Sequence, residues 1–176
     1  MNKIMQIIKE NTVFIIALIL ILVIRFYFIS IDVVVGSSME PTLSNDDVVI
    51  VDSKFYKLTE LERFDIIIFD NDKSNEEFYL VKRVIGLPGE TVEMKNNELY
   101  INGNKIKVSS EILRMNQKTL DFNSGVIPQN HYFVLGDNRE LSLDSRSEDV
   151  GYVSKNNITG KTIFRQRPFN KMGFVK

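Results

Sequence analysis

A run of apolar residues from Thr12 to Ile31, in which Arg25 is the only charge, limits most strongly what this chain can fold into. A transmembrane helix needs about 20 predominantly apolar residues, and an arginine near one end can extend its head to the lipid headgroups. The aromatic residues Phe26 to Phe28 lie near that same end, where tyrosine favours the membrane interface. Because the run is apolar on every side, it predicts a membrane helix rather than a buried soluble helix.

The flanks of this run favour a retained anchor over a cleaved signal peptide. A signal peptide has a shorter apolar core of about 7 to 15 residues and small residues at its cleavage site, and no Ala-x-Ala-like site follows Ile31. Lys3 and Lys9 precede the run and Asp32 follows it, and positive charge favours the cytoplasmic side. We expect residues 1–31 to be a short cytoplasmic N-terminus and a single-pass anchor in the cell membrane, with the remaining chain outside the cytoplasm.

From Asp32 onward, short runs rich in Val, Ile, Phe and Tyr alternate with Asn, Asp, Gly and Pro. This pattern is typical of antiparallel β structure, and Asn102-Gly103 is a strong signal for a two-residue hairpin turn. Residues 32–176 are therefore predicted to form one mainly β domain, with about 95–128 as a small, more polar cap or insert beside the main sheet. The expected strands are 47–51, 64–69, 78–85, 90–94, 98–101, 105–108, 131–135 and 161–167.

The composition excludes several classes of function. The formal net charge of −1 gives no basic surface for a nucleic acid, so no nucleic-acid partner is expected. The chain contains no Cys, which removes cysteine nucleophiles, thiolate zinc sites and disulfides. We expect no metal and no cofactor.

The stretch from Gly36 to Leu43 contains the candidate nucleophile, Ser38, in a turn marked by Gly36 and Pro41. Glycine and proline fix an irregular backbone that can expose a side chain and its N–H groups to a ligand. A serine hydroxyl is a poor nucleophile unless another group takes its proton. Considered alone, this stretch also fits an ordinary polar loop.

Lys82 is the candidate base, because it lies in a β-type run that begins at Tyr79. At strand period two, it shares a face with Leu80 and Val84 and is flanked by hydrocarbon. Burial can lower the pKa of a lysine by roughly 3 to 5 units, which would supply a neutral amine as general base. The alternative is a lysine whose head reaches water.

A dense polar loop, Gly136 to Arg146, follows the strand-like run that begins at His131. Ser142 can hydrogen-bond an amine, and Asp144 with Arg146 can form a charge-assisted pair that holds the loop in one geometry. A solvated surface loop is the alternative. His131 is the only histidine; it could pair with a serine in principle, but we expect it to have a structural or surface role.

Together these motifs resemble those of type I signal peptidases, membrane-anchored Ser/Lys proteases that remove signal peptides from exported preproteins. The resemblance covers nearly the whole chain, and the shared motifs are Ser38 to Leu43, Asp46 to Val51, Phe64 to Phe69, Lys82 to Glu90, and Gly136 to Arg139 with Ser142, Asp144 and Arg146. It implies an antiparallel β catalytic domain of the signal-peptidase type, Ser38 as nucleophile and Lys82 as general base. It also implies that Ser142 and Asp144, with Arg146, orient and support the site.

The resemblance further implies the partners and the oxyanion hole. The substrates would be preproteins with small residues, typically alanine, at the first and third positions before the cut, processed at the lipid bilayer. Some members carry a serine two residues before the nucleophile, where this chain has Gly36. The hole then depends on the Ser38 backbone N–H and on other N–H groups or water. A serine at position 36 is expected to be tolerated if the local φ is negative and strained if it is positive.

Two alternatives belong to other classes. Self-cleaving transcriptional repressors share a Ser/Lys pair and a β-rich domain, but they need a DNA-binding segment where this chain has its apolar run. A membrane-anchored β domain that only binds partners would keep its function when Ser38 is replaced. A penicillin-recognising enzyme is disfavoured, because no Ser-x-x-Lys occurs in the chain.

Overall fold

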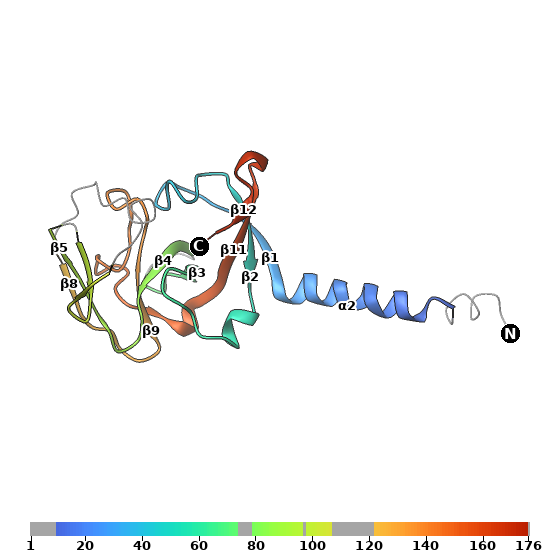
Figure 1. Cartoon of the computed structure of the whole chain (residues 1–176), viewed down its shortest axis with the longest axis horizontal. Coiled ribbons are helices and arrows are strands. Elements are labelled where there is room, and N and C mark those ends of the chain that lie inside the picture. The colour runs from blue at the N-terminus through green and yellow to red at the C-terminus, as the bar shows by residue number, and fades with distance from the viewer. Residues whose placement is uncertain (1–9, 74–78, 97, 107–121, 176) are drawn as a thin grey trace.

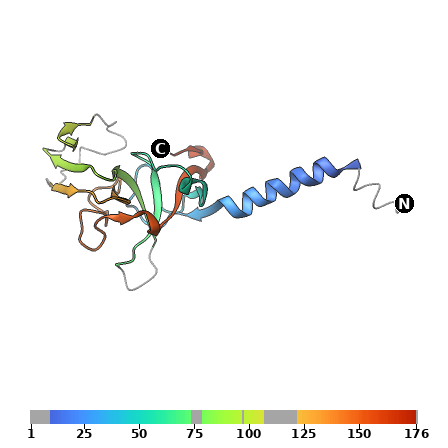
Figure 2. The same cartoon turned by 90° about the horizontal axis from the view of Figure 1, so that it is seen from below.

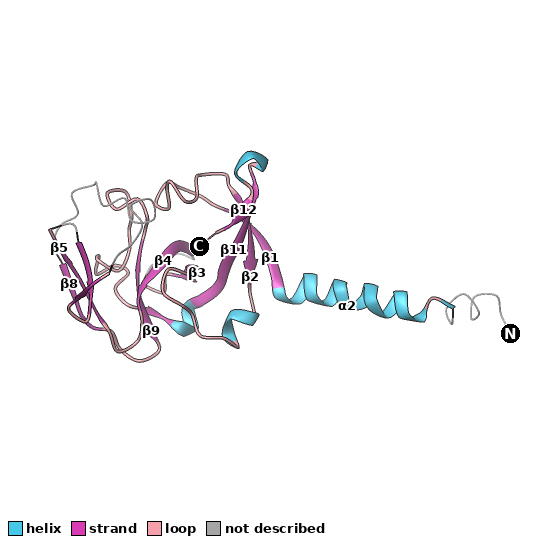
Figure 3. Ribbon diagram, viewed as in Figure 1, coloured by secondary structure: helices cyan, strands magenta, loops and turns pink. Residues whose placement is uncertain are grey.

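The computed structural model describes residues 10–73, 79–96, 98–106 and 122–175. One long helix, α2, precedes a chain made almost entirely of strands and loops (Figure 3). The elements, in chain order, are α2 (Thr12–Phe28), β1 (Ile29–Val33), β2 (Val48–Asp52), the 3-10 turn η1 (Phe55–Lys57), β3 (Ile66–Asp70), β4 (Tyr79–Gly86), β5 (Thr91–Lys95), β6 (Glu98–Ile101), β7 (Asn104–Lys105), β8 (Phe122–Val126), β9 (His131–Leu135), β10 (Val153–Ser154), η2 (Lys155–Asn157), β11 (Ile158–Arg167), η3 (Phe169–Lys171) and β12 (Gly173–Phe174).

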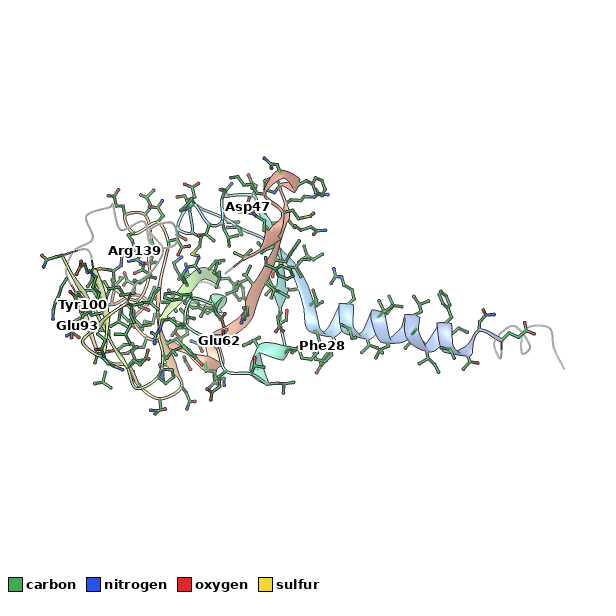
Figure 4. The ribbon with its side chains drawn as sticks, in the orientation of Figure 1. Phe28, Asp47, Glu62, Glu93, Tyr100 and Arg139 are labelled. Atoms are coloured by element: carbon green, nitrogen blue, oxygen red, sulfur yellow. The ribbon has the colours of Figure 1, made fainter. Side chains whose placement is uncertain are left out.

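The apolar run forms α2, which projects away from the β-strands in both views (Figure 1, Figure 2). The helix ends at Phe28, whose ring stacks on Phe55 of η1 at a centroid distance of 4.2 Å (Figure 4). The prediction of a helix continuing to Ile31 is wrong, because Ile29–Val33 pairs as β1 with β2. Within the described residues, no helix is both long enough and apolar enough to cross a membrane.

The strands form two antiparallel sheets, so the prediction of a mainly β domain is confirmed. The larger sheet has the order β1-β2-β11-β3-β4-β9-β10, with β12 paired to β11. The smaller has the order β7-β6-β5-β8 and lies at the end of the molecule away from α2 (Figure 1). Strand β4 is central to the site that follows, because it pairs with β3 on one side and β9 on the other.

The strand predictions differ in accuracy. The bounds of β6 and β9 match, and β2, β3, β4 and β5 begin within two residues of the predicted start. Strands β1, β8, β10 and β12 were not predicted as strands, and β11 begins earlier than expected. The sector 95–128, predicted as a small, more polar cap or insert, contributes β6, β7 and β8 to the smaller sheet; the expected strand 105–108 extends into residues outside those described.

Buried side chains connect the layers and fix the stretch around Ser38. One cluster joins β5 and β6 of the smaller sheet to β4 and β9 of the larger sheet, through side chains such as Val92, Leu99 and Phe133. Another cluster buries Met39 and Leu43 against β2 and β3. Burying one such side chain contributes about 1.5–3 kcal/mol, so the two residues hold the Ser38 turn on the sheet.

Candidate active site

The turn that carries Ser38 depends on Gly36. Gly36 has a φ of +93°, a left-handed conformation that favours glycine. Its N–H donates to the Asn45 side-chain oxygen at 2.8 Å, and two residues later Ser38 presents its hydroxyl to β4. The sequence analysis left the sign of φ at Gly36 open, and in the structure this φ is positive.

Lys82 lies in β4 opposite Ile67 of β3, and its neighbours on the same face, Leu80 and Val84, are in the core. Its side chain is buried, so the alternative in which the amine reaches water is wrong. The amine donates hydrogen bonds to Ser38 Oγ and to the Val81 carbonyl oxygen, each at 2.9 Å.

Burial lowers the pKa of the Lys82 amine to about 8, although the nearby carboxylates of Asp144 and Asp137 partly oppose the shift. An amine with this pKa exists partly in its neutral form near neutral pH. It can therefore accept a proton from the adjacent Ser38 hydroxyl.

The loop after β9 touches the backbone of Ser38. Gly136 packs so closely that a Cβ placed on it would lie 2.6 Å from the Ser38 carbonyl oxygen. The Asn138 N–H donates to that same oxygen at 2.9 Å, and the Asn138 side-chain amide donates to the Ser37 carbonyl oxygen at 3.2 Å. The sequence analysis identified this loop as part of the candidate site. It did not single out Gly136 and Asn138 as the residues that hold the backbone of Ser38.

Asp144 and Arg139 bind the backbone N–H and the carbonyl oxygen of Gly136, respectively. The buried Asp144 carboxylate accepts the Gly136 N–H at 3.0 Å, and Arg139 Nε donates to the Gly136 carbonyl oxygen at 3.0 Å; Arg139 is labelled in Figure 4. Arg146 binds both Asp144 oxygens, with Nε 2.7 Å from Oδ1 and Nη2 2.8 Å from Oδ2. The ion pair expected between Asp144 and Arg146 is present, and it orients the loop.

Ser142 does not make the expected hydrogen bond to an amine. Its Oγ is buried and has no hydrogen-bond partner among the described residues. It lies against Gly136, where an added Cβ would overlap with Ser142 Oγ. Ser142 therefore belongs to the loop that supports Ser38, and its hydroxyl is unsatisfied in this structure.

A buried ion pair that the sequence analysis missed connects three parts of the site. Arg83 Nη2 lies 2.7 Å from Asp137 Oδ2, and both side chains are buried. Thr42 Oγ1 donates to the same carboxylate oxygen at 2.5 Å. The pair connects the strand of Lys82, the loop after β9 and the Ser38 turn. The available signal was an arginine in an apolar strand, since a buried cation requires a partner.

His131 lies at the end of β9 opposite to the loop that holds Ser38. It is the first residue of β9, whereas Gly136 follows the last one, and a strand advances about 3.3 Å per residue. Its Nδ1 lies 2.9 Å from the Gln129 carbonyl oxygen. The structure therefore does not pair His131 with Ser38.

A cavity of about 740 Å3 runs past Ser38 and Lys82. Its lining is mostly apolar and includes Val34, Val35, Met39, Val49, Val51 and Ile68. A concave, mostly apolar surface with a few convergent polar groups is typical of a ligand site. We call this cavity the groove.

A serine in contact with a buried lysine beside an apolar groove is the arrangement of a Ser/Lys hydrolase. The family model described as signal peptidase, peptidase S26, matches residues 4–166. Signal peptidase I S of Bacillus subtilis is 42% identical over 168 residues, covering 90% of this chain and 88% of that protein. Signal peptidase I of Bacillus licheniformis is 40% identical over 179 residues, covering 93% and 94%.

A solved structure agrees with these relatives. The crystal structure of a signal peptidase I from Enterococcus faecalis V583 matches with a TM-score of 0.51 and 36% identity, covering 58% of this chain and 97% of that one. The chain belongs to the signal peptidase family, peptidase S26. It is a serine endopeptidase that removes signal peptides, and the resemblance found in the sequence is confirmed.

Proposed function

We propose that Ser38 and Lys82 carry out the cleavage of signal peptides by this chain. The observation that supports this assignment best is the 2.9 Å contact between Lys82 Nζ and Ser38 Oγ, made by a lysine that is only 1% exposed. Neutral Lys82 accepts the Ser38 proton as Oγ attacks the scissile carbonyl, and it returns that proton to the leaving amine. Water then hydrolyses the acyl-enzyme, with Lys82 again as the base.

The N–H of Ser38 is the proposed donor to the oxyanion. Among the described residues it has no hydrogen-bond acceptor, so it is available to the oxygen that becomes negative in the tetrahedral intermediate. Gly36 supplies no hydroxyl, and any further donor is a backbone N–H or water. Asp144, Arg146 and Ser142 are proposed as supporting residues, because their loop packs against the Ser38 carbonyl through Gly136.

The N-terminal part of the chain is the proposed anchor. In this arrangement the N-terminus is cytoplasmic, the apolar segment before β1 passes once through the cell membrane, and the catalytic domain outside the cytoplasm begins with β1 rather than at residue 32. Support comes from the apolar sequence of α2 and from the direct continuation of α2 into β1, a strand that lines the groove. The sector 95–128 is proposed as an insert beside the catalytic sheet.

The proposed substrates are preproteins presented at the bilayer, with small residues at the first and third positions before the cut. The groove supports this choice because valine and methionine side chains line it next to Ser38. Polar or charged side chains would lose hydration there without gaining a partner.

The test uses the full chain in lipid vesicles with a labelled preprotein. Ser38→Ala should lower cleavage at least about a thousandfold, whereas Ser37→Ala, which removes the adjacent hydroxyl, should cleave at a rate close to the unmodified enzyme. Circular dichroism checks that both variants are folded. Undiminished cleavage by folded Ser38→Ala would refute the assignment of the nucleophile, and a requirement for Ser37 instead would move that role to the neighbouring residue.

A further inference from the structure

The groove changes character along its length. Next to the catalytic pair it is lined by side chains such as Met39 and Val81, whereas along β1 and just after β2 the lining includes Ser30, Asp32 and Ser53. Ser30 pairs with Val51 and Asp32 with Val49, so both point to the same face of the sheet. The groove therefore has an apolar part at the scissile bond and a polar part along β1.

Asp32 is the acidic residue of this polar part, and its carboxylate is held in place. Ser53 Oγ donates to Ser30 Oγ at 3.1 Å, and Ser30 Oγ donates to Asp32 Oδ2 at 2.9 Å. Within the described part of the chain, Asp32 Oδ1 accepts no hydrogen bond and no Lys or Arg forms an ion pair with Asp32. One oxygen of a half-buried carboxylate is thus open to a cationic donor in the groove.

The position of Asp32 indicates which part of a substrate it meets. Strand β1 continues directly from α2 (Figure 1), and its residues Ser30 and Asp32 line the polar part of the groove. In the proposed function, the apolar core of the signal peptide lies in the same bilayer as α2. The substrate residues between that core and the cut then pass over β1. Asp32, which lines the groove that contains Ser38, then meets one of these residues on the signal-peptide side of the cut.

We propose that Asp32, oriented by Ser30 and Ser53, forms a charge-selective subsite that favours Lys or Arg and disfavours Asp or Glu at one substrate position between the apolar core of the signal peptide and the cut. The proposal rests on the proposed function, because it uses the groove as the substrate site. A cationic side chain there donates a charge-assisted hydrogen bond to Asp32 Oδ1. An acidic side chain meets a like charge in a groove that shields it only partly from water.

The first test uses the unmodified full-length enzyme in detergent. A series of signal-peptide substrates carries a single Lys or a single Glu at each position from the second to the seventh before the cut. The ratio of kcat/KM for the Lys peptide to that for the Glu peptide should reach about threefold to fivefold at one or two of these positions and stay near one at the others. It should fall as salt is raised, because the interaction is between charges near solvent.

The second test assigns the preference to Asp32. Asp32→Asn should bring the ratio close to one, and Asp32→Lys should invert it. Asp149→Asn is the matched control: Asp149 also accepts a hydrogen bond from the serine two residues before it, Ser147, but lies outside the groove, so this variant should keep the ratio.

Two outcomes would overturn the subsite: a ratio near one at every position in the unmodified enzyme, or an unchanged ratio in Asp32→Asn. If the unmodified enzyme cleaved none of the peptides, the proposed function would fail, and the subsite with it. If the peptides were cleaved with no charge preference, only the subsite would fail.

Discussion

At the scale of single residues, the chemistry depends on the protonation state of the Lys82 amine. Its pKa is lowered to about 8 by burial, so its neutral fraction increases as the pH rises through that value. A base that must be neutral to act produces an ascending limb in kcat/KM against pH at the pKa of the free enzyme. We expect this limb to have its midpoint near pH 8.

Replacing this amine by a guanidinium separates the lysine mechanism from a histidine mechanism. Arginine keeps the positive charge but is not deprotonated in proteins, so Lys82→Arg should lower preprotein cleavage at least about a thousandfold. His131→Ala should keep most of the activity and the same ascending limb, because His131 contacts Gln129 rather than Ser38. An active Lys82→Arg enzyme beside an inactive, folded His131→Ala enzyme would reverse the assignment.

The backbone conformation of Gly36 leads to a further prediction at the scale of single residues. Because its φ is +93°, Gly36→Ser should lower the free energy of unfolding by about 1–2 kcal/mol, and it should reduce turnover rather than add an oxyanion donor. Gly173→Ser is the control, since Gly173 has open space around it and no positive φ. Denaturant unfolding and kcat for both variants test this; a stable Gly36→Ser enzyme with raised kcat would contradict it.

At the scale of elements, the loop after β9 determines where Ser38 sits. Gly136→Ala would place a Cβ 2.6 Å from the Ser38 carbonyl oxygen and 2.5 Å from Ser142 Cβ. The first is a backbone atom, which cannot yield without moving the Ser38 turn. Because a displacement of about 1 Å can cost roughly a hundredfold in rate, kcat should fall by about that factor. Gly173→Ala should retain the activity. If Gly136→Ala kept full kcat, the close contact with Ser38 would have no catalytic importance.

The sequence predicted elements where one pattern dominated and failed where two patterns overlapped. His131–Leu135 is a compact apolar run between turn signals, and its strand was predicted with the observed bounds. Ile29–Val33 has the same residue types as the helix before it, so no local signal separates strand β1 from α2. Phe122–Val126 contains Asn123, Ser124 and Gly125, and it becomes a strand only through pairing with β5.

Within the candidate site, the same limit applies to contacts between distant segments. Ser38 and Lys82 could be selected because each has a local signal, a marked turn and a charge in an apolar strand. The Arg83–Asp137 pair joins residues 54 positions apart, and nothing near either residue indicates its partner. The unsatisfied Ser142 hydroxyl also depends on how closely Gly136 packs, which only the folded chain determines.

At the scale of the whole molecule, anchor and catalytic domain meet within one continuous segment. Strand β1 follows α2 without a linker, pairs with β2 along its length and lines the groove with Ser30 and Asp32. A truncation at residue 31 therefore removes the first three residues of β1, whereas a truncation at residue 28 leaves the strand complete.

Two truncations should thus behave differently. Deleting residues 1–28 should leave a folded enzyme that cleaves a soluble peptide at nearly the full rate. Its rate on a preprotein embedded in vesicles should fall roughly a hundredfold or more, because enzyme and substrate no longer share one bilayer and the high effective concentration that it provides.

Deleting residues 1–31 should in addition lower the Tm and the rate on the soluble peptide, since three residues of the β1–β2 ladder are lost. Thermal unfolding and cleavage of both substrates distinguish these effects. Full activity of the shorter deletion on the embedded preprotein would contradict an anchoring role for α2, and equal Tm values for the two truncations would show that β1 adds nothing to the stability of the sheet.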